Sequence, residues 1–209
     1  MKPDILLSGS APDSGMLIFR VYAAEIPETE RKQAHRAEHF AALELLSAAL
    51  KEDFGVTHAA IRRTGLEKPR LLHRFLHMNL SHCKGLAVCA VGRLPLGVDA
   101  EAPRAVKPHL LQKVCTAAET AEILAADDPE TAFSRRWTLK EAYAKLTGAG
   151  IRTPFDRLAF SLADGIRFLH PDAGRLRFFQ MTRPSSHIIS LCLPDGSYTV
   201  QAGSGMTFR

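Results

Sequence analysis

The sequence predicts an α+β fold made of two similar halves, and three observations lead to this prediction. The pattern of elements is strand, long helix, strands over residues 1–103, and then helices, long helix, strands over residues 104–209. Residues 85–92 (GLAVCAVG) are apolar on both faces, which is typical of a central strand. With 209 residues, of which 46% are hydrophobic, the chain is long enough to bury a core. We therefore expect an N-terminal and a C-terminal half related by a pseudo-two-fold, with the functional site between them.

The first half begins with turn signals, because residues 1–15 contain SGS and PDSG. A helix is expected from Pro27 to about Phe54, where alanines and leucines recur at helical spacing. Strands are expected at residues 16–23, 85–92 and 94–101, with shorter extended segments at 55–64 and 75–80. The strand at residues 85–92 is expected to be the central one.

The second half begins after a boundary at residues 103–108, which holds prolines at both ends. Thr116, followed three residues later by Glu119, predicts a capping box at the start of a short helix. Pro129 opens the long helix, and Gly148 is suited to end it. The remaining elements are expected as a helix at 110–114 and strands at 158–162, 176–181 and 187–193.

Composition limits the partners and the compartment. The net charge of +5 favours anionic partners, and its even spread along the chain argues against nucleic acid. The four cysteines show no CxxC spacing, which fits a reducing cytosol. No apolar run approaches membrane-spanning length, and the run at residues 5–7 is too short for a signal peptide. We therefore expect a cytoplasmic protein that does not act at a membrane.

Two carboxylates share one face of the strand expected at residues 94–101. Successive strand side chains point to opposite faces, so Asp99 and Glu101 lie together while Ala100 points away. Carboxylates this close repel each other unless a cation or a proton lies between them. Hard divalent cations such as Mg²⁺ prefer oxygen ligands and keep waters and phosphate oxygens as further ligands. The pair is therefore a candidate metal site.

The helix over residues 137–145 (WTLKEAYAK) has two unlike faces. One is an apolar stripe typical of a core. The other carries an aromatic ring, a carboxylate and two ammonium groups: Trp137, Glu141, Lys140 and Lys145. Taken alone, this face is compatible with a solvated surface that carries one Glu141–Lys145 pair at i,i+4. If the fold brings the helix to the strand, Glu141 adds a third carboxylate to the strand pair.

Four short motifs follow one another along the chain in a specific order. They are Lys68-Pro69, residues 79–82 (NLSH), residues 97–101 (GVDAE) and residues 137–145 (WTLKEAYAK). In this order they resemble the motifs of 4′-phosphopantetheinyl transferases, the last two being similar to that family's signatures. At 209 residues the chain resembles the larger, surfactin-synthetase-type branch, in which one chain holds two similar halves.

The resemblance implies Mg²⁺-dependent transfer of the 4′-phosphopantetheine arm of coenzyme A to a serine of an apo acyl or peptidyl carrier protein, releasing 3′,5′-ADP. It implies Mg²⁺ ligands at Asp99, Glu101 and Glu141. Glu141, or a water that it orients, would take the serine proton, and Lys145 and Lys140 would offset charge on the pyrophosphate and the leaving 3′,5′-ADP. Coenzyme A would be bound through a larger set: Lys68, Ser81, His82, Asp99, Lys140 and Lys145. The resemblance also implies an acidic carrier, since the recognition helix of these carriers is usually acidic; this suits the net charge, and a monomer is expected.

Two other interpretations stay open on the sequence alone. A module that binds a carrier protein without chemistry would keep the fold, but the intact set of carboxylates and Lys145 favours the enzyme. A Mg²⁺-dependent phosphohydrolase would explain the carboxylates but leaves residues 79–82 unexplained. Trp137 is expected to be a packing residue that supports the site, and the basic residues Arg31, Lys32 and Arg36 only loosely match those that meet the coenzyme A 3′-phosphate.

Overall fold

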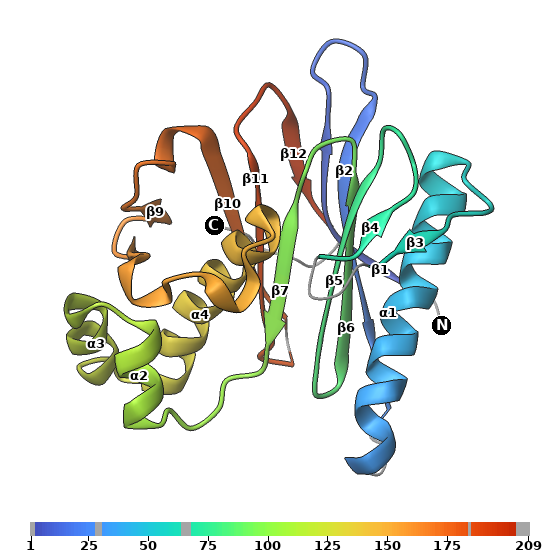
Figure 1. The fold of residues 1–209 in the computed structure, drawn as a ribbon. Helices are drawn as coiled ribbons and strands as arrows, with labels where there is room; N and C mark the ends of the chain where they lie inside the picture. Colours follow the sequence, from blue (N-terminus) through green and yellow to red (C-terminus); the bar gives the residue numbers. More distant parts are fainter. Residues whose placement is uncertain (1–2, 28–30, 64–67, 184, 204–209) are drawn as a thin grey trace.

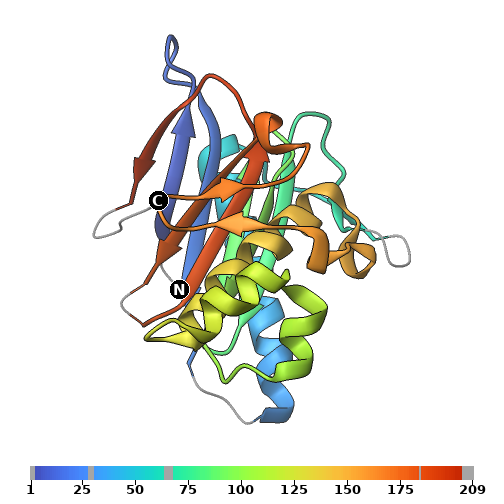
Figure 2. The ribbon, with the colours of Figure 1, turned by 90° about the vertical axis from the view of Figure 1, so that its left-hand side faces the viewer.

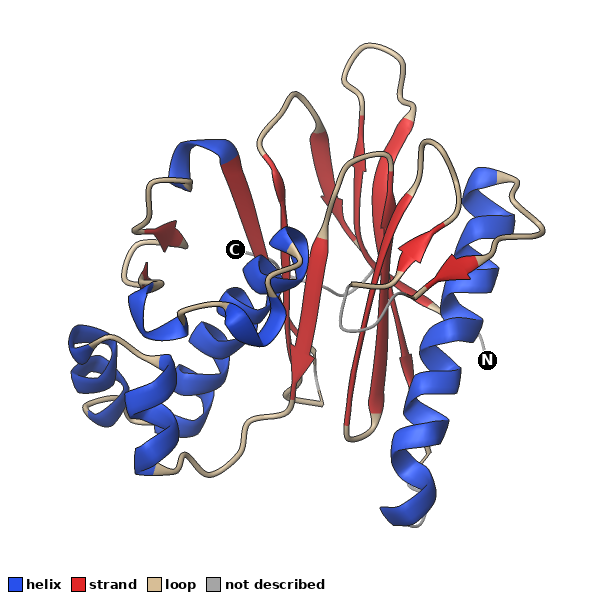
Figure 3. Ribbon diagram, viewed as in Figure 1, coloured by secondary structure: helices blue, strands red, loops and turns tan. Residues whose placement is uncertain are grey.

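The computed structural model describes residues 3–27, 31–63, 68–183 and 185–203, with the side chains of 31–35 and 151 excluded. Its elements are drawn in Figure 1 and coloured by type in Figure 3. In chain order they are β1 (Asp4–Ser10), β2 (Leu17–Glu25), α1 (Arg31–Phe54), β3 (Ile61–Arg62), β4 (Arg70–Leu71), β5 (His77–Cys83), β6 (Leu86–Gly92), β7 (Gly97–Glu101), α2 (Pro108–Val114), α3 (Ala117–Leu124), α4 (Pro129–Thr147), the 3-10 turns η1 (Gly150–Arg152) and η2 (Phe155–Arg157), β8 (Phe160–Ser161), β9 (Arg167–Phe168), the 3-10 turn η3 (Ala173–Arg175), β10 (Leu176–Thr182), β11 (Ile188–Pro194) and β12 (Thr199–Ala202).

The larger sheet has the order β12-β1-β2-β6-β5, and all its neighbouring strands are antiparallel. Every residue of β6 is buried, as its two-sided apolar sequence predicts. The long helix α1 packs on the outer face of this sheet, where its alanines and leucines meet Met78, Cys89 and Val91. Figure 1 shows α1 lying along that side of the strands.

The smaller sheet has the order β10-β11-β7, and its two faces are buried in different ways. Its inner face packs on the larger sheet, and Val98, Ala100 and Leu191 join the main core there. Its outer face is covered by α4 through Leu139 and Ala142. Figure 2 shows α4, with α2 and α3, in front of the strands. The result is an α+β fold in which two sheets lie between two long helices, which confirms the predicted class.

Strand pairing crosses the predicted boundary between the halves in both directions. β7, from the first half, forms the edge of the smaller sheet, where Asp99 lies opposite Ser190. β12, from the second half, pairs with β1 in the larger sheet. Each half therefore completes a sheet of the other, and the division at residue 103 stays a prediction about sequence organisation.

The prediction that residues 1–15 are rich in turns is wrong for β1. Leu6 and Leu7 are fully buried, and β1 has a pairing partner on each side. One of those partners is β12, almost two hundred residues away, so no local pattern announces the strand. Burial of two leucines and two ladders of hydrogen bonds outweigh the turn-forming serines and glycine.

Two short helices form a layer beside α4. Thr116 and Glu119 form the predicted capping box at the start of α3, and each accepts a hydrogen bond from the other's backbone N–H. Gly148 ends α4 in the left-handed conformation, with φ of 75°, as the sequence predicts. None of the described helices is long and apolar enough to cross a membrane.

Candidate active site

The site forms where α4 lies directly on β7. A Cβ atom built on Gly97 would stand 2.1 Å from the carbonyl oxygen of Ala142 and 2.5 Å from the backbone nitrogen of Leu146. Only glycine permits this approach of helix backbone to strand. Side chains of β7 alternate, so Asp99 and Glu101 share the face of Gly97 and point towards the helix. The glycine of the GVDAE motif thus brings the strand carboxylates to α4.

Asp99 and Lys145 form the central ion pair of this contact. Lys145 Nζ lies 2.7 Å from Asp99 Oδ1, and Asp99 is 5% exposed. The other carboxylate oxygen, Oδ2, is buried and has no hydrogen-bond partner. A buried charged oxygen without a partner is costly, so it is a natural ligand for a cation. Lys145 is paired with the strand here, so it is not confined to the helix-surface pair with Glu141 that its spacing allows.

Burial and the charge of Asp99 raise the pKa values of the other two carboxylates, Glu141 and Glu101. Burial, followed by the charge of Asp99, raises the pKa of Glu141 to about 7, with Glu101 adding to the rise and Lys145 opposing it. Burial and the charge of Asp99 also raise the pKa of Glu101 above its ordinary value. Three acidic groups from β7 and α4 are therefore brought into one electrostatic cluster, as the sequence predicts.

Trp137 contributes more than packing. Its Nε1–H donates a hydrogen bond of 3.1 Å to Glu101 Oε1. The centre of its ring lies 5.3 Å from the ring centre of Phe155. Arg104 approaches the same carboxylate oxygen at 3.9 Å. Trp137 therefore orients Glu101 from the middle of α4, a role that only the packing of α4 on β7 reveals.

A cavity of about 520 Å³ opens beside this cluster. Its walls come from α1, the β3–β4 hairpin, β5 and the C-terminal end of α4, and they include Lys68, His82 and Lys145. Lys68 donates a 2.6 Å hydrogen bond to the carbonyl oxygen of Leu96. Burial, with the charges of Arg70 and Lys145, lowers the pKa of Lys68 to about 8. The structure therefore brings these three predicted site residues to one cavity.

His82 lines this cavity and contacts α1. Its Nδ1 lies 3.3 Å from Glu38 Oε2. Its ring packs edge-on against the ring of His39, with the two ring centres 5.9 Å apart. Arg36 is exposed on the same helix, whereas the side chains of Arg31 and Lys32 lie outside the described residues. The prediction that His82 lines the binding site agrees with its place in the cavity wall.

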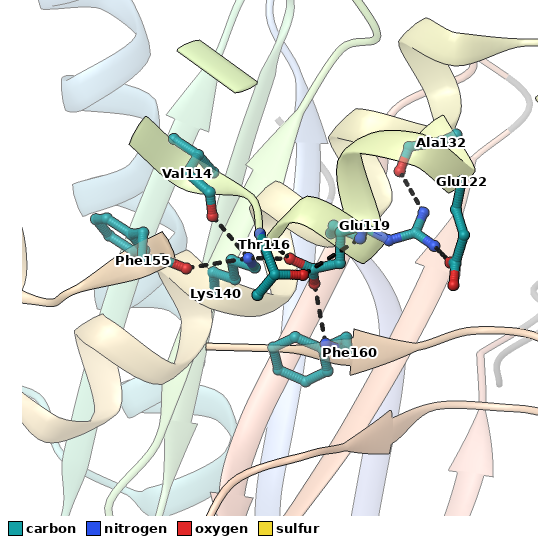
Figure 4. Close-up of polar contacts among 9 residues, drawn as sticks. Val114, Thr116, Glu119, Glu122, Ala132, Lys140, Phe155 and Phe160 are labelled. Carbon is teal, nitrogen blue, oxygen red and sulfur yellow. Dashed lines mark hydrogen bonds and ion pairs between the residues drawn. The ribbon is translucent and has the colours of Figure 1, made fainter. Parts of the chain in front are cut away.

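Lys140 does not reach the cluster, so its predicted contact with the pyrophosphate is wrong for this structure. Its side chain is fully buried, and Nζ lies 2.6 Å from Glu119 Oε2 and 2.6 Å from the carbonyl oxygen of Val114. A third hydrogen bond, of 3.0 Å, goes to the carbonyl oxygen of Phe155. Figure 4 shows the ammonium group enclosed by these acceptors. Every proton of the ammonium group is used inside the fold, so Lys140 holds α4 to α3 and its neighbours.

Glu119 is the partner that sequence reasoning missed. Besides Lys140, it accepts hydrogen bonds from the backbone N–H groups of Thr116 and Phe160 at 2.9 Å each. It is 2% exposed, which is exceptional for a glutamate. The capping-box motif predicted the bond to Thr116, but nothing in the local sequence indicated the buried pair with Lys140.

The contacts of Ser81 also differ from the predicted contact with coenzyme A. Its hydroxyl donates to Asp99 Oδ1 at 3.0 Å and accepts from the backbone N–H of Ala100 at 3.2 Å and from Lys145 Nζ at 2.9 Å. A serine hydroxyl has one donor and two acceptor positions. All three are occupied by the protein, so in this structure the hydroxyl supports Asp99 and leaves nothing for a coenzyme A phosphate.

The donor set fits a hard divalent cation in its chemistry. Among the residues that the structure describes, no three of His, Cys, Asp and Glu are already arranged to hold a metal ion. The partnerless Asp99 Oδ2 and the raised pKa values of Glu101 and Glu141 nevertheless mark a cluster with excess negative charge. A cation would relieve that repulsion.

Comparison with known proteins agrees with this geometry. The family model of the 4′-phosphopantetheinyl transferase superfamily matches residues 95–201, which include β7 and α4. The chain belongs to this superfamily. The transferase motifs at residues 97–101 and 137–145, which form the carboxylate cluster, both fall in the matched segment.

Curated relatives of the chain are 4′-phosphopantetheinyl transferases. The chain is 28% identical over 88 residues to 4′-phosphopantetheinyl transferase Sfp of Bacillus subtilis, covering 41% of this chain and 39% of that protein. It is 36% identical over 77 residues to psf-1 of Bacillus pumilus, covering 36% and 33%. The matched segments thus span well under half of these two relatives. A solved structure of holo-[acyl-carrier-protein] synthase from Neisseria meningitidis shares 20% identity, with a TM-score of 0.41, and covers 49% of this chain and 98% of that one.

Proposed function

We propose that the chain transfers the 4′-phosphopantetheine arm of coenzyme A to a serine of an apo acyl or peptidyl carrier protein and releases 3′,5′-ADP. The observation that carries the proposal is the cluster of Asp99, Glu141 and Lys145, whose Lys145 also lines a cavity of about 520 Å³. Membership of the transferase superfamily supports it.

Glu141 is proposed as the general base. A base works best when its pKa lies near the working pH, and in the protein without a bound cation burial together with the charge of Asp99 raises the pKa of Glu141 to about 7. Its carboxylate, or a water that it orients, takes the proton of the carrier serine as the serine oxygen bonds to the phosphorus of the arm. The bond from that phosphorus to the departing 3′,5′-ADP breaks, and the ammonium group of Lys145 offsets the negative charge on the pyrophosphate.

Asp99, Glu101 and Glu141 would hold Mg²⁺. When bound, the ion would neutralise charge on the pyrophosphate of coenzyme A. Within the protein, Trp137 orients Glu101 and Lys145 fixes Asp99, which leaves Asp99 Oδ2 free as an acceptor. These contacts hold the oxygen donors in place before any ligand enters.

Lys68 and His82 are proposed to contact coenzyme A from the cavity wall. Lys68 has a pKa of about 8, so it is mostly charged at neutral pH and attracts phosphate. The net charge of +5 suits an acidic carrier protein. We propose that the enzyme is a monomer and meets its carrier in the reducing cytosol.

Nucleotide release with and without a carrier tests the proposal. The protein is incubated with coenzyme A and Mg²⁺, either alone or with an apo-carrier, and 3′,5′-ADP is quantified by chromatography. A transferase releases it only when the apo-carrier is present. Release without carrier would identify a phosphohydrolase, and no release with any of several carriers would identify a binding module.

A further inference from the structure

Strands β5 and β7 lie against each other at the place where the two sheets meet. They belong to different sheets, and no backbone ladder joins them within these fully described segments. Two side chains of β5 replace that ladder. Asn79 Oδ1 accepts the backbone N–H of Val98 at 2.7 Å, and Ser81 Oγ accepts the backbone N–H of Ala100 at 3.2 Å.

The spacing of these bonds makes a two-point brace. Asn79 and Ser81 are two residues apart and so point to the same side of β5, and the two N–H groups they bind are two residues apart on β7. Asn79 and Ser81 are 6% and 5% exposed, so water cannot easily substitute for them. Without the two side chains, two buried N–H groups of β7 would lack acceptors.

The residue between the two braced N–H groups is Asp99. Ser81 also donates its own proton to Asp99 Oδ1, which adds a third point to the brace. With Oδ1 held by Ser81 and Lys145, the carboxylate has one orientation, and Oδ2 is left as the partnerless oxygen. The brace therefore fixes the position of β7 relative to β5 and the direction of Asp99 Oδ2.

We propose that Asn79 and Ser81 are positioning residues that set the affinity of Asp99 for the divalent cation. The inference rests on the proposed function in that it takes Asp99 as a cation ligand. Residues that hydrogen-bond a metal ligand commonly change metal affinity by 10–100-fold when removed. Neither side chain touches the cation itself, and Ser81 is assigned to Asp99 and not to a coenzyme A phosphate.

The test is direct binding of Mn²⁺, followed by electron paramagnetic resonance of the free ion, with coenzyme A present and no carrier. Asn79→Ala and Ser81→Ala are each expected to weaken Mn²⁺ binding about 10-fold or more. Ser81→Thr keeps the hydroxyl and should stay within about threefold of the wild type. Val91→Ala removes methyl groups from the core between β6 and α1 and is the matched control; it should also stay within about threefold.

The outcomes separate this inference from the proposed function. If Asn79→Ala does not fold, Ser81→Ala and its rescue by Ser81→Thr decide the matter. Wild-type affinity in both alanine variants, an equal loss in the Val91→Ala control, or no Mn²⁺ binding by the wild type would overturn the positioning role. A wild-type protein that binds Mn²⁺ with the expected pattern but transfers nothing to any carrier would refute the proposed function alone.

Discussion

Replacing Lys140 by methionine tests whether this motif lysine acts in chemistry or in packing. Methionine has a similar length and shape but no charge, so the change removes the ammonium group and little volume. The substitution breaks one buried ion pair with Glu119 and leaves the carbonyl oxygens of Val114 and Phe155 without their donor. The site carboxylates keep their own contacts.

The size of the effect follows from what stays behind. Removing one partner of a buried ion pair commonly costs about 3–5 kcal/mol, because the other charge is left uncompensated. Glu119 still accepts two backbone N–H groups, so we expect the lower end of that range. A loss of about 3 kcal/mol lowers the melting temperature of a chain of this size by about 6–12 °C.

The assay combines urea denaturation with carrier modification at 20 °C. Lys140→Met should lower the free energy of unfolding by about 3 kcal/mol while kcat/KM stays within about threefold of the wild type. Lys113→Met makes the same chemical change at an exposed position on α2 and should alter neither stability nor activity. Unchanged stability with a large fall in kcat would refute the structural role and return Lys140 to the reaction.

Three further changes probe other parts of the account. Gly97→Ala would place Cβ 2.1 Å from the Ala142 carbonyl oxygen, so we expect a loss of more than about 3 kcal/mol in the free energy of unfolding, or insoluble protein. A melting temperature near that of the wild type would instead show that α4 shifts easily. Because the pKa of Glu141 is raised to about 7, the folded protein holds a proton that the unfolded chain releases, and stability falls as pH rises from about 4.5 to 7. Glu141→Gln should therefore be about 1–2 kcal/mol more stable than the wild type at pH 8, after allowing for solvent screening, with no difference below about pH 4; equal stability at pH 8 would contradict the raised pKa. The KM for carrier, unlike that for coenzyme A, should rise several-fold with salt, and a flat response would mean that recognition is mainly apolar.

Patterns that depend on neighbouring residues were enough to predict much of this fold. The two-sided apolar run of β6 and the capping box of α3 are local signals, and both appear in the structure. Strand alternation placed Asp99 and Glu101 on one face, and the charge of Asp99 does help to raise the pKa of Glu101. These predictions succeeded because the deciding interactions are close in the chain.

The features that the sequence did not predict depend on contacts between segments that are distant in the chain. β1 is stabilised by pairing with β12, whose residues lie at the other end of the chain. A helical wheel gives the angle between Lys140 and Glu141 but not which element covers each face, and α3 covers Lys140. Ser81 supports Asp99 because β5 meets β7 without a ladder, an arrangement that no strand pattern encodes.

Intact-mass spectrometry of an apo-carrier is the most direct test that Asp99 and its neighbours form an arm-transferring site. The carrier is incubated with coenzyme A, Mg²⁺ and either the wild-type protein or Asp99→Asn. We predict that the wild type adds one phosphopantetheine arm with a free thiol to a single serine, and that the folded Asp99→Asn variant adds none. A carrier mass that stays unchanged with the wild type, or that rises equally with Asp99→Asn, would contradict the account.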